Sequence, residues 1–527
     1  LRDLDALAAE NYPADQPGAA ILVEKDGQVI LRKGYGLANV ELGVPVSPEM
    51  VFEVGSVTKQ FTAAAILMLA ERGELRFDDE VTRFFPDFPT HGKKITVEHL
   101  LTHTSGIPSY TGIEEWGQQV REDITVDQLI AFFRGKPLDF EPGSRMAYNN
   151  SGYVLLGAIV EKLSGKSYED FIEQEIFQPL GMTRSRYGNR SEVVPGRAYG
   201  YIKKGDRYDT APYVSMTQPY AAGALLSTVD DLARWDKALS AERLLRRASL
   251  DRMFTPVRLS NGLPTTYGYG ISMYDFQGHR VTEHGGDIHG FSCHLLRVPE
   301  ERLFVIVLSN NPYAPRRPDA LALRLAARVL GRSVGAAPAV QLSEKEMSEY
   351  VGVYRVDPQV IRVVTLEDGR LYTRRNNAAR LALVPLGKDL FGYEDSESRV
   401  RFQRDAAGRI TGMELAPRFG AVDAAARTDE APPAERQAVK VDPAIYEAYV
   451  GEYALNPEMS IVILREGDQL FVQPSGQLRR EILPVSETDF FIKEVDALLV
   501  FSRGADGKAA KLVLHQGGKE MPAPRVK

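Results

Sequence analysis

The first apolar residues of the chain fall into two short runs separated by a turn signal. Residues 20–23 and 29–31 are apolar, and they flank Lys25-Asp26-Gly27-Gln28. An Asp-Gly pair between two apolar runs is a strong hairpin signal, because both residues tolerate the positive φ of a tight turn. We therefore predict an antiparallel β-hairpin close to the N-terminus.

Helical and strand-like patterns follow in blocks. Apolar positions from about Ser56 to Gly73 have helical spacing, and residues 100–180 show several helical segments broken by loops. Strand-like apolar runs return over residues 267–309, and a last helix is predicted over Asp319–Leu330. Strands at both ends with helices between them predict one α/β (α+β) unit. Its first and last segments should share an antiparallel sheet flanked by helices.

After Gly331 the composition changes and the sequence repeats itself. YVGVY at residues 350–354 recurs as YVGEY at residues 449–453, an offset of 99 residues. The same offset relates six further pairs: Leu371 and Leu470, Pro385 and Pro484, Phe391 and Phe490, Phe402 and Phe501, Arg404 and Arg503, Gly408 and Gly507. We therefore predict two copies of one all-β module, each a small antiparallel barrel.

These patterns predict three domains. The boundaries are residues 1–335 for the α/β unit, 341–427 for the first barrel and 437–527 for the second. Gly335-Ala336-Ala337-Pro338 forms one linker, and the Ala- and Pro-rich segment Ala424–Ala438 forms the other. A chain of 527 residues is also too long for one hydrophobic core.

The composition limits the possible binding partners of the protein but does not indicate which reaction, if any, it catalyses. The net charge is −7 with acids and bases interspersed, so we expect neither nucleic acid nor an anionic membrane as a partner. The longest strongly apolar run, Ala63–Ala70, is far shorter than the roughly 20 residues of a membrane span. Cys293 is the only cysteine, which excludes an intrachain disulfide. The chain begins at Leu1 rather than Met, which indicates a processed or trimmed start.

The first motif that carries chemistry is Ser56-Val57-Thr58-Lys59. Residues three apart at a helix start share one face, so the hydroxyl and the ammonium are neighbours. A serine hydroxyl needs a partner that accepts its proton before it can act as a nucleophile. The helix N-terminus adds partial positive charge where an oxyanion would form. Alone, this short motif also occurs by chance.

Two further motifs supply the remaining groups. Tyr148-Asn149-Asn150 follows a turn, and Tyr148 can act as a base only where a cation such as Lys59 stabilises its phenolate. Asn150 can donate to a substrate carbonyl or accept from Lys59. In His284-Gly285-Gly286, the absence of side chains at an edge strand would let substrate backbone approach at Gly286. The N–H groups of Asp287 and Ser56 are then the predicted oxyanion donors.

A metal site is the weaker alternative. His99 and His103 are four residues apart and could share a helical face, yet the sequence offers no clear third ligand. We therefore expect neither a metal ion nor an organic cofactor.

Together the motifs resemble the serine penicillin-recognising hydrolases, in the branch that contains class C β-lactamases, D-alanyl carboxypeptidases, esterases and D-aminopeptidases. Four surrounding segments match as well: LLTHTSG at 100–106, EPG at 141–143, GALLST at 223–228 and YGYG at 267–270. The likeness covers residues 1–333. The resemblance is greatest to the D-aminopeptidases, on the strength of Ser-x-x-Lys-Gln-Phe-Thr at residues 56–62, His-Gly-Gly and two trailing barrels, which it implies to be lipocalin-like.

The resemblance implies roles for the motif residues. Ser56 would be the nucleophile, Lys59 and Tyr148 the proton-handling pair, and Asn150 and His284 substrate contacts. Many β-lactamases and carboxypeptidases have Lys in place of His284, and that Lys helps hold a substrate carboxylate. A histidine is mostly neutral at pH 7, which argues against carboxylate-bearing β-lactams and favours an amide or ester with a free amino group.

The leading expectation is a hydrolase of small peptides or amides containing D-residues, acting through an acyl-enzyme on Ser56. A β-lactamase or D-alanyl carboxypeptidase and a promiscuous esterase stay open, as does a non-enzyme that binds a ligand or cell-wall fragment. Family analogy suggests a periplasmic or extracellular location, with the cytoplasm also open. The sequence leaves the oligomeric state and the D or L preference undecided.

Overall fold

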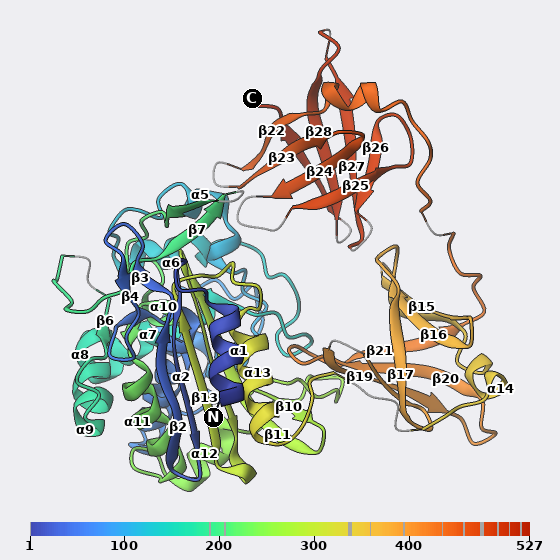
Figure 1. Ribbon diagram of the computed structural model, residues 1–527. Coiled ribbons are helices and arrows are strands. Elements are labelled where there is room, and N and C mark those ends of the chain that lie inside the picture. The colour runs from blue at the N-terminus through green and yellow to red at the C-terminus, as the bar shows by residue number, and fades with distance from the viewer. Residues whose placement is uncertain are drawn as a thin grey trace. The chain divides into compact units, whose positions relative to one another are not determined.

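The computed structural model of the protein (Figure 1) consists of two compact units. Unit 1 comprises Leu1–Val334 and Arg418–Ala421, and unit 2 comprises Gly335–Pro417 and Val422–Lys527. The structure describes residues 2–188, 191–204, 207–335, 340–358, 360–393, 396–434, 436–456, 459–474, 479–492, 495–504, 506–516 and 519–526.

Unit 1 is built on a six-stranded antiparallel sheet of order β10-β11-β12-β13-β1-β2. The predicted hairpin is present as β1 (Ala19–Lys25) and β2 (Gln28–Tyr35), with Asp26 and Gly27 both at positive φ. β1 pairs with β13 (Leu303–Ser309) along its whole length, so the two ends of the unit share one sheet as expected. The remaining strands are β10 (Ser272–Phe276), β11 (His279–Ile288) and β12 (Phe291–Val298).

Both faces of this sheet are covered, because alternate residues of its central strands enter two different cores. In β1, Ile21 belongs to a core with α1 (Arg2–Asn11) and α13 (Pro318–Val329), whereas Leu22 belongs to the larger core on the other face. The period-two alternation of a strand produces this division. In Figure 1, α1 and α13 lie next to each other on one side of the sheet.

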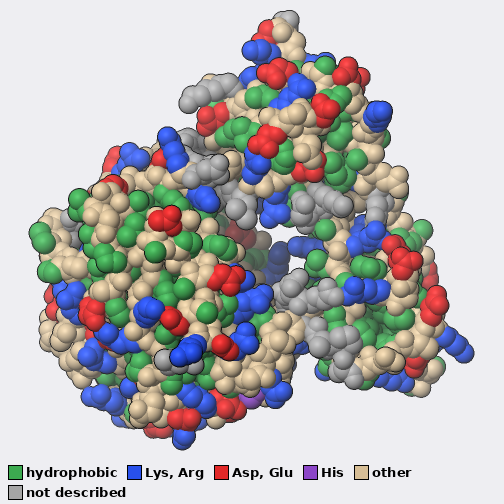
Figure 2. Space-filling model, in the orientation of Figure 1, with side chains coloured by type: hydrophobic (Ala, Val, Ile, Leu, Met, Phe, Trp, Pro, Cys, Tyr) green, Lys and Arg blue, Asp and Glu red, His purple; other side chains and the backbone are tan. Residues whose placement is uncertain are grey.

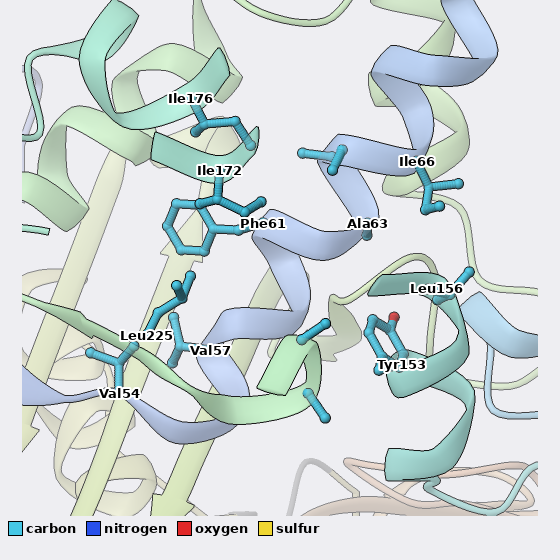
Figure 3. Close-up of a cluster of buried hydrophobic side chains, with 14 of the residues drawn as sticks. Val54, Val57, Phe61, Ala63, Ile66, Tyr153, Leu156, Ile172, Ile176 and Leu225 are labelled. Carbon is cyan, nitrogen blue, oxygen red and sulfur yellow. The ribbon is translucent and has the colours of Figure 1, made fainter. Parts of the chain in front are cut away.

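The larger core surrounds α2 (Thr58–Glu71), which follows the single 3-10 turn η1 (Gly55–Val57). Every residue of α2 from Thr58 to Leu69 is buried, so the helix is enclosed on all sides. Figure 3 shows Phe61 of α2 packed beside Ile172 and near Ile176. This packing gives the start of α2 a fixed position against the sheet.

Local capping explains where the neighbouring helices begin and end. Asn149 caps α7 (Asn150–Ser164), which ends at Gly165 in the left-handed conformation, and Thr228 caps α11 (Val229–Ser240). The other helices of unit 1 are α3 (Val81–Phe84), α4 (Val97–Leu101), α5 (Glu114–Gly117), α6 (Val126–Arg134), α8 (Tyr168–Ile172), α9 (Gln178–Leu180), α10 (Tyr220–Gly223) and α12 (Arg247–Met253), with 3-10 turns η2 (Tyr110–Gly112) and η4 (Pro299–Glu301) and the π-helical turn η3 (Glu173–Phe177).

Small sheets complete unit 1. They are β5 (Phe52–Glu53) with β9 (Leu225–Ser227) and β6 (Arg186–Tyr187), β3 (Leu37–Asn39) with β4 (Val44–Pro45), and β7 (Tyr201–Lys204) with β8 (Arg207–Thr210).

None of the helices in the described ranges is long and apolar enough to cross a membrane. Positive and negative side chains are interspersed on the face shown in Figure 2.

Unit 2 contains the two predicted β-modules. Eight strands form a closed antiparallel barrel: β14 (Gly352–Asp357), β15 (Val360–Glu367), β16 (Arg370–Arg375), β17 (Leu381–Gly387), β18 (Leu390–Tyr393), β19 (Ser396–Arg404), β20 (Ile410–Ala416) and β21 (Asp423–Thr428). The second module is an eight-stranded meander: β22 (Gly451–Asn456), β23 (Met459–Glu466), β24 (Gln469–Pro474), β25 (Arg480–Pro484), β26 (Asp489–Ile492), β27 (Ala497–Arg503), β28 (Ala509–Gln516) and β29 (Lys519–Pro524). The short helices α14 (Glu344–Ser348) and η5 (Pro443–Ala448) precede the two modules.

The repeat is visible in equivalent contacts. The Tyr354 hydroxyl donates to the Tyr350 carbonyl at 2.7 Å, and 99 residues later the Tyr453 hydroxyl donates to the Tyr449 carbonyl at 2.8 Å. An isolated antiparallel bridge between Tyr453 and Arg525 joins the first strand of the second module to the residue after its last strand. Both modules are therefore barrel-like, as predicted.

The predicted linkers need one correction. The segment Ala424–Ala438 does not begin as a linker, because its first residues belong to β21, which closes the first barrel against β14. The core of the other predicted linker, residues 336–338, lies outside the described residues. The domain boundaries 1–335, 341–427 and 437–527 stay predictions.

Candidate active site

Ser56 and Lys59 lie at the junction of η1 and α2, where the three-residue spacing brings their side chains together. Lys59 Nζ is 3.0 Å from Ser56 Oγ. The same nitrogen donates to Asn150 Oδ1 at 2.8 Å and to the Ala222 carbonyl at 2.8 Å. Lys59 is fully buried, and this burial lowers the pKa of its amine well below the usual value.

The partners of Lys59 fit a neutral amine. Asn150 Oδ1 and the Ala222 carbonyl oxygen can only accept hydrogen bonds, so each accepts one from the two N–H groups of a neutral amine. The Asn150 amide is oriented by its Nδ2, which donates to Thr111 Oγ1 at 3.2 Å. The nitrogen lone pair is then left facing the Ser56 hydroxyl. This geometry suits proton transfer from Ser56 to Lys59.

Tyr148 completes the cluster. Its ring centroid is 4.8 Å from Lys59 Nζ. Its hydroxyl is shielded from solvent and makes no hydrogen bond to any residue that the structure describes. Burial raises the pKa of the Tyr148 phenol, although the nearby Ser56 hydroxyl opposes this in part. The resting side chain is therefore a phenol, which suits a proton donor better than a base.

His284 on β11 is held by both ring nitrogens. Nε2 is 2.8 Å from the Tyr267 hydroxyl, and Nδ1 is 2.6 Å from the Gly285 carbonyl. Because a carbonyl cannot donate, the proton resides on Nδ1, and Nε2 accepts from Tyr267. Burial lowers the pKa of His284 to about 3, so the ring is neutral at pH 7. A substrate contact by His284 would have to replace one of these bonds.

Gly286 has a role that sequence reasoning did not assign to it. A Cβ placed at Gly286 would lie 1.9 Å from the Val54 carbonyl oxygen and 2.9 Å from the Ser56 nitrogen. The absent side chain therefore lets residues 54–56 approach β11, whereas the sequence predicts that it admits substrate backbone. A Cβ on Gly55 would in turn lie 3.0 Å from the Asp287 nitrogen. The backbone segments that carry the Ser56 and Asp287 N–H groups therefore lie against each other.

His103 is the residue that sequence reasoning missed, since it was considered only as a metal ligand. It has φ +61°, its Nδ1 accepts the Asn149 N–H at 3.1 Å, and its carbonyl accepts the Ala147 N–H at 2.9 Å. It therefore holds the backbone on both sides of Tyr148. The matching LLTHTSG segment was the available signal.

The predicted alternative of paired histidine ligands is not favoured by the geometry. His99 Nδ1 instead accepts the Thr96 N–H at 3.3 Å, as part of the capping box of α4. No group of three or more candidate ligands occurs in the described part of the chain.

Comparison with known proteins assigns the family. Residues 6–328 match the family model described as Beta-lactamase. The chain belongs to the β-lactamase family. This is a fold family of serine hydrolases. In addition, residues 435–524 match the model of a domain of unknown function, DUF3471.

Relatives cover different shares of the chain. Penicillin-binding protein 4* of Bacillus subtilis is 29% identical over 530 residues, covering 97% of this chain and 96% of the relative. D-aminopeptidase of Gluconobacter oxydans is 29% identical over 345 residues, covering 64% of this chain and 63% of that protein.

Solved structures agree on the fold. The octameric penicillin-binding protein homologue from Pyrococcus abyssi has a TM-score of 0.56 at 30% identity, over 80% of this chain and 99% of that one. A D-stereospecific amidohydrolase from Streptomyces sp. has a TM-score of 0.53 at 26% identity, over 61% of this chain and 97% of that one.

Proposed function

We propose that this serine hydrolase cleaves small amides or peptides that present a free amino group on a D-residue, through an acyl-enzyme on Ser56. The observation that carries the proposal is the position of the Lys59 amine, whose buried nitrogen lies within hydrogen-bond distance of Ser56 Oγ, Asn150 Oδ1 and the Ala222 carbonyl oxygen. The similarity to a D-aminopeptidase and a D-stereospecific amidohydrolase supports the substrate class.

The proposed acylation follows from the charges. Lys59 takes the Ser56 proton as Oγ attacks the scissile carbonyl, and the N–H groups of Ser56 and Asp287 stabilise the oxyanion. Tyr148 donates its phenolic proton to the leaving nitrogen as the C–N bond breaks. The phenolate then recovers a proton from the Lys59 ammonium, so both groups return to their resting states. Water repeats the sequence on the acyl-enzyme, and Ser56 is regenerated.

The third motif bears on the substrate. Both ring nitrogens of the neutral His284 are engaged, by Tyr267 and by Gly285. His284 therefore attracts a substrate carboxylate much more weakly than a lysine ammonium would. This favours substrates recognised without a carboxylate beside the scissile bond. It disfavours β-lactams and D-alanyl peptides with a free C-terminus.

A second candidate function is that of a penicillin-binding protein. It is favoured by the alignment with Penicillin-binding protein 4*, which spans nearly all of both chains. In that case penicillin would acylate Ser56, and D-aminoacyl amides would be poor substrates.

One experiment tests both candidates. The full chain is assayed with paired D- and L-aminoacyl para-nitroanilides and with a chromogenic cephalosporin, and its intact mass is measured after exposure to penicillin. Faster turnover of the D-anilides supports the proposal, with Ser56→Ala as the inactive control. A stable penicillin adduct without anilide turnover supports the second candidate. Turnover by the Ser56→Ala variant near the parent rate contradicts both.

A further inference from the structure

The segment Arg418–Ala421 follows β20 along the chain but belongs to unit 1. Gly420 exchanges two hydrogen bonds with Thr266, one from the Thr266 N–H to the Gly420 carbonyl and one from the Gly420 N–H to Thr266 Oγ1, both at 2.8 Å. Ala421 forms an antiparallel bridge with Thr265. These bonds align the segment with the residues that lead into β10.

A buried ion pair fixes the other end of the segment. Arg418 donates to both carboxylate oxygens of Glu283, from Nε at 2.9 Å and from Nη2 at 2.7 Å. Glu283 is 7% exposed, and His294 Nε2 lies 3.0 Å from the same carboxylate. Burial alone would raise the pKa of Glu283, but His294 and Arg418 outweigh it and hold the pKa at about 2. The carboxylate is therefore ionised, and this two-pronged pair has a defined geometry.

Between these anchors, Phe419 packs against the catalytic cluster. Its ring centroid is 5.8 Å from that of Tyr148 and 5.8 Å from that of Tyr267, edge to face in both cases. Yet 45% of Phe419 is exposed, so much of the ring has no partner. It lines a cavity of about 240 Å³ together with His284 and Asp287. A largely exposed apolar ring thus packs directly against the ring of the proposed proton donor.

We propose that Phe419 is a specificity-determining residue, whose exposed face binds an apolar or aromatic substituent on the leaving nitrogen of the substrate. The inference rests on the proposed function. If Tyr148 protonates the leaving nitrogen, the substituent on that nitrogen lies beside the Tyr148 ring and within reach of Phe419. The ion pair of Arg418 with Glu283 holds the ring there, so less side-chain entropy is lost on binding.

The test uses the full chain and a series of D-alanyl substrates with one acyl group and different leaving groups: the anilide, the benzylamide, the methylamide and the simple amide. The measured quantity is the ratio of kcat/KM for the benzylamide to that for the methylamide. Phe419→Leu keeps an apolar side chain, whereas Phe419→Asn introduces a polar side chain of about the size of leucine. We expect the Leu variant to keep the ratio within about threefold and the Asn variant to lower it roughly tenfold.

The outcomes distinguish a wrong role for Phe419 from a wrong proposed function. If the parent enzyme turns over the series and the Asn variant leaves the ratio unchanged, the role of Phe419 is wrong while the proposed function stands. If the parent enzyme hydrolyses none of these amides, the proposed function fails first. Phe419→Ala gives the same comparison if the Asn variant does not fold, as judged by its thermal transition.

Discussion

The imidazole of His103 packs against the phenol ring of Tyr148, with the two ring centroids 4.4 Å apart. The same residue binds the backbone N–H groups of Ala147 and Asn149. Ring and backbone contacts together restrain the only side chain of the proposed relay that lacks a hydrogen bond among the described residues. His103 is therefore a positioning residue for Tyr148.

Replacing His103 should impair turnover more than substrate binding. In His103→Ala, Tyr148 loses a neighbour and the Asn149 N–H loses its acceptor, so we expect kcat to fall about 10- to 100-fold with KM changed less than threefold. His103→Asn tolerates the positive φ and offers an acceptor, so it should recover part of the rate. His91→Asn is the matched control, since His91 also has positive φ but is exposed. A rise in KM with unchanged kcat would contradict this role.

Removing the Tyr148 hydroxyl should lower the catalytic activity without lowering the thermal stability of the protein. Because that hydroxyl is buried without a partner, Tyr148→Phe should leave the thermal midpoint unchanged or higher, while kcat falls about 10²- to 10⁴-fold. Tyr153→Phe is the converse control: its hydroxyl donates to the Leu101 carbonyl at 2.8 Å, so about 1 kcal/mol of stability should be lost with activity retained. Equal loss of activity in both variants would argue against a proton-donating Tyr148.

Acid should destabilise the protein in part through His284. Its folded pKa of about 3 lies below the unfolded value near 6.5, so the unfolded chain binds more protons between these pH values. The stabilisation that the neutral His284 gives to the folded state is fully present above about pH 6.5. As the pH falls, the free energy of unfolding decreases by about 1.4 kcal/mol per pH unit down to roughly pH 3. His284→Gln should flatten this dependence in denaturant unfolding at pH 4 to 7. An unchanged slope would mean that His284 is not buried as a neutral ring.

Adding one methyl group to β11 should distinguish its two glycines. Gly286→Ala places a Cβ 1.9 Å from the Val54 carbonyl oxygen, which forces β11 and η1 apart and should abolish turnover. Gly285→Ala places its Cβ 3.1 Å from His294 Nδ1, a contact that a displacement of a few tenths of an ångström relieves. We expect the second variant to keep at least a tenth of the parent kcat/KM. Comparable activity in the two variants would refute the close approach.

Local pattern was sufficient for much of the fold. The Asp26-Gly27 hairpin, the helix after Ser56 and the 99-residue repeat each depend on residues near in sequence or on internal similarity, and all three are present. The Ala-rich start of the segment after residue 423 is a strand rather than the predicted linker, because small residues also suit a strand that closes a barrel.

The site was less accessible to such reasoning. The proximity of Ser56 and Lys59 follows from helical spacing. The hydrogen bond from Lys59 to Asn150, one of the two roles predicted for Asn150, is present and joins residues 91 positions apart. His103 and Phe419 both pack against the Tyr148 ring, and these contacts join residues that lie far apart in the sequence. Gly286 was assigned to substrate access, since the sequence does not reveal that Val54 lies against it.

The pairing of β1 with β13 has a consequence for biosynthesis. The hairpin leaves the ribosome early, but its sheet partner begins at Leu303. At typical elongation rates of 5–20 residues per second, roughly 15 to 60 seconds pass before that partner is made. During this interval the hairpin carries an unprotected edge that could recruit other nascent chains. Chaperone demand should therefore be greatest before Leu303 emerges and should fall once β13 docks.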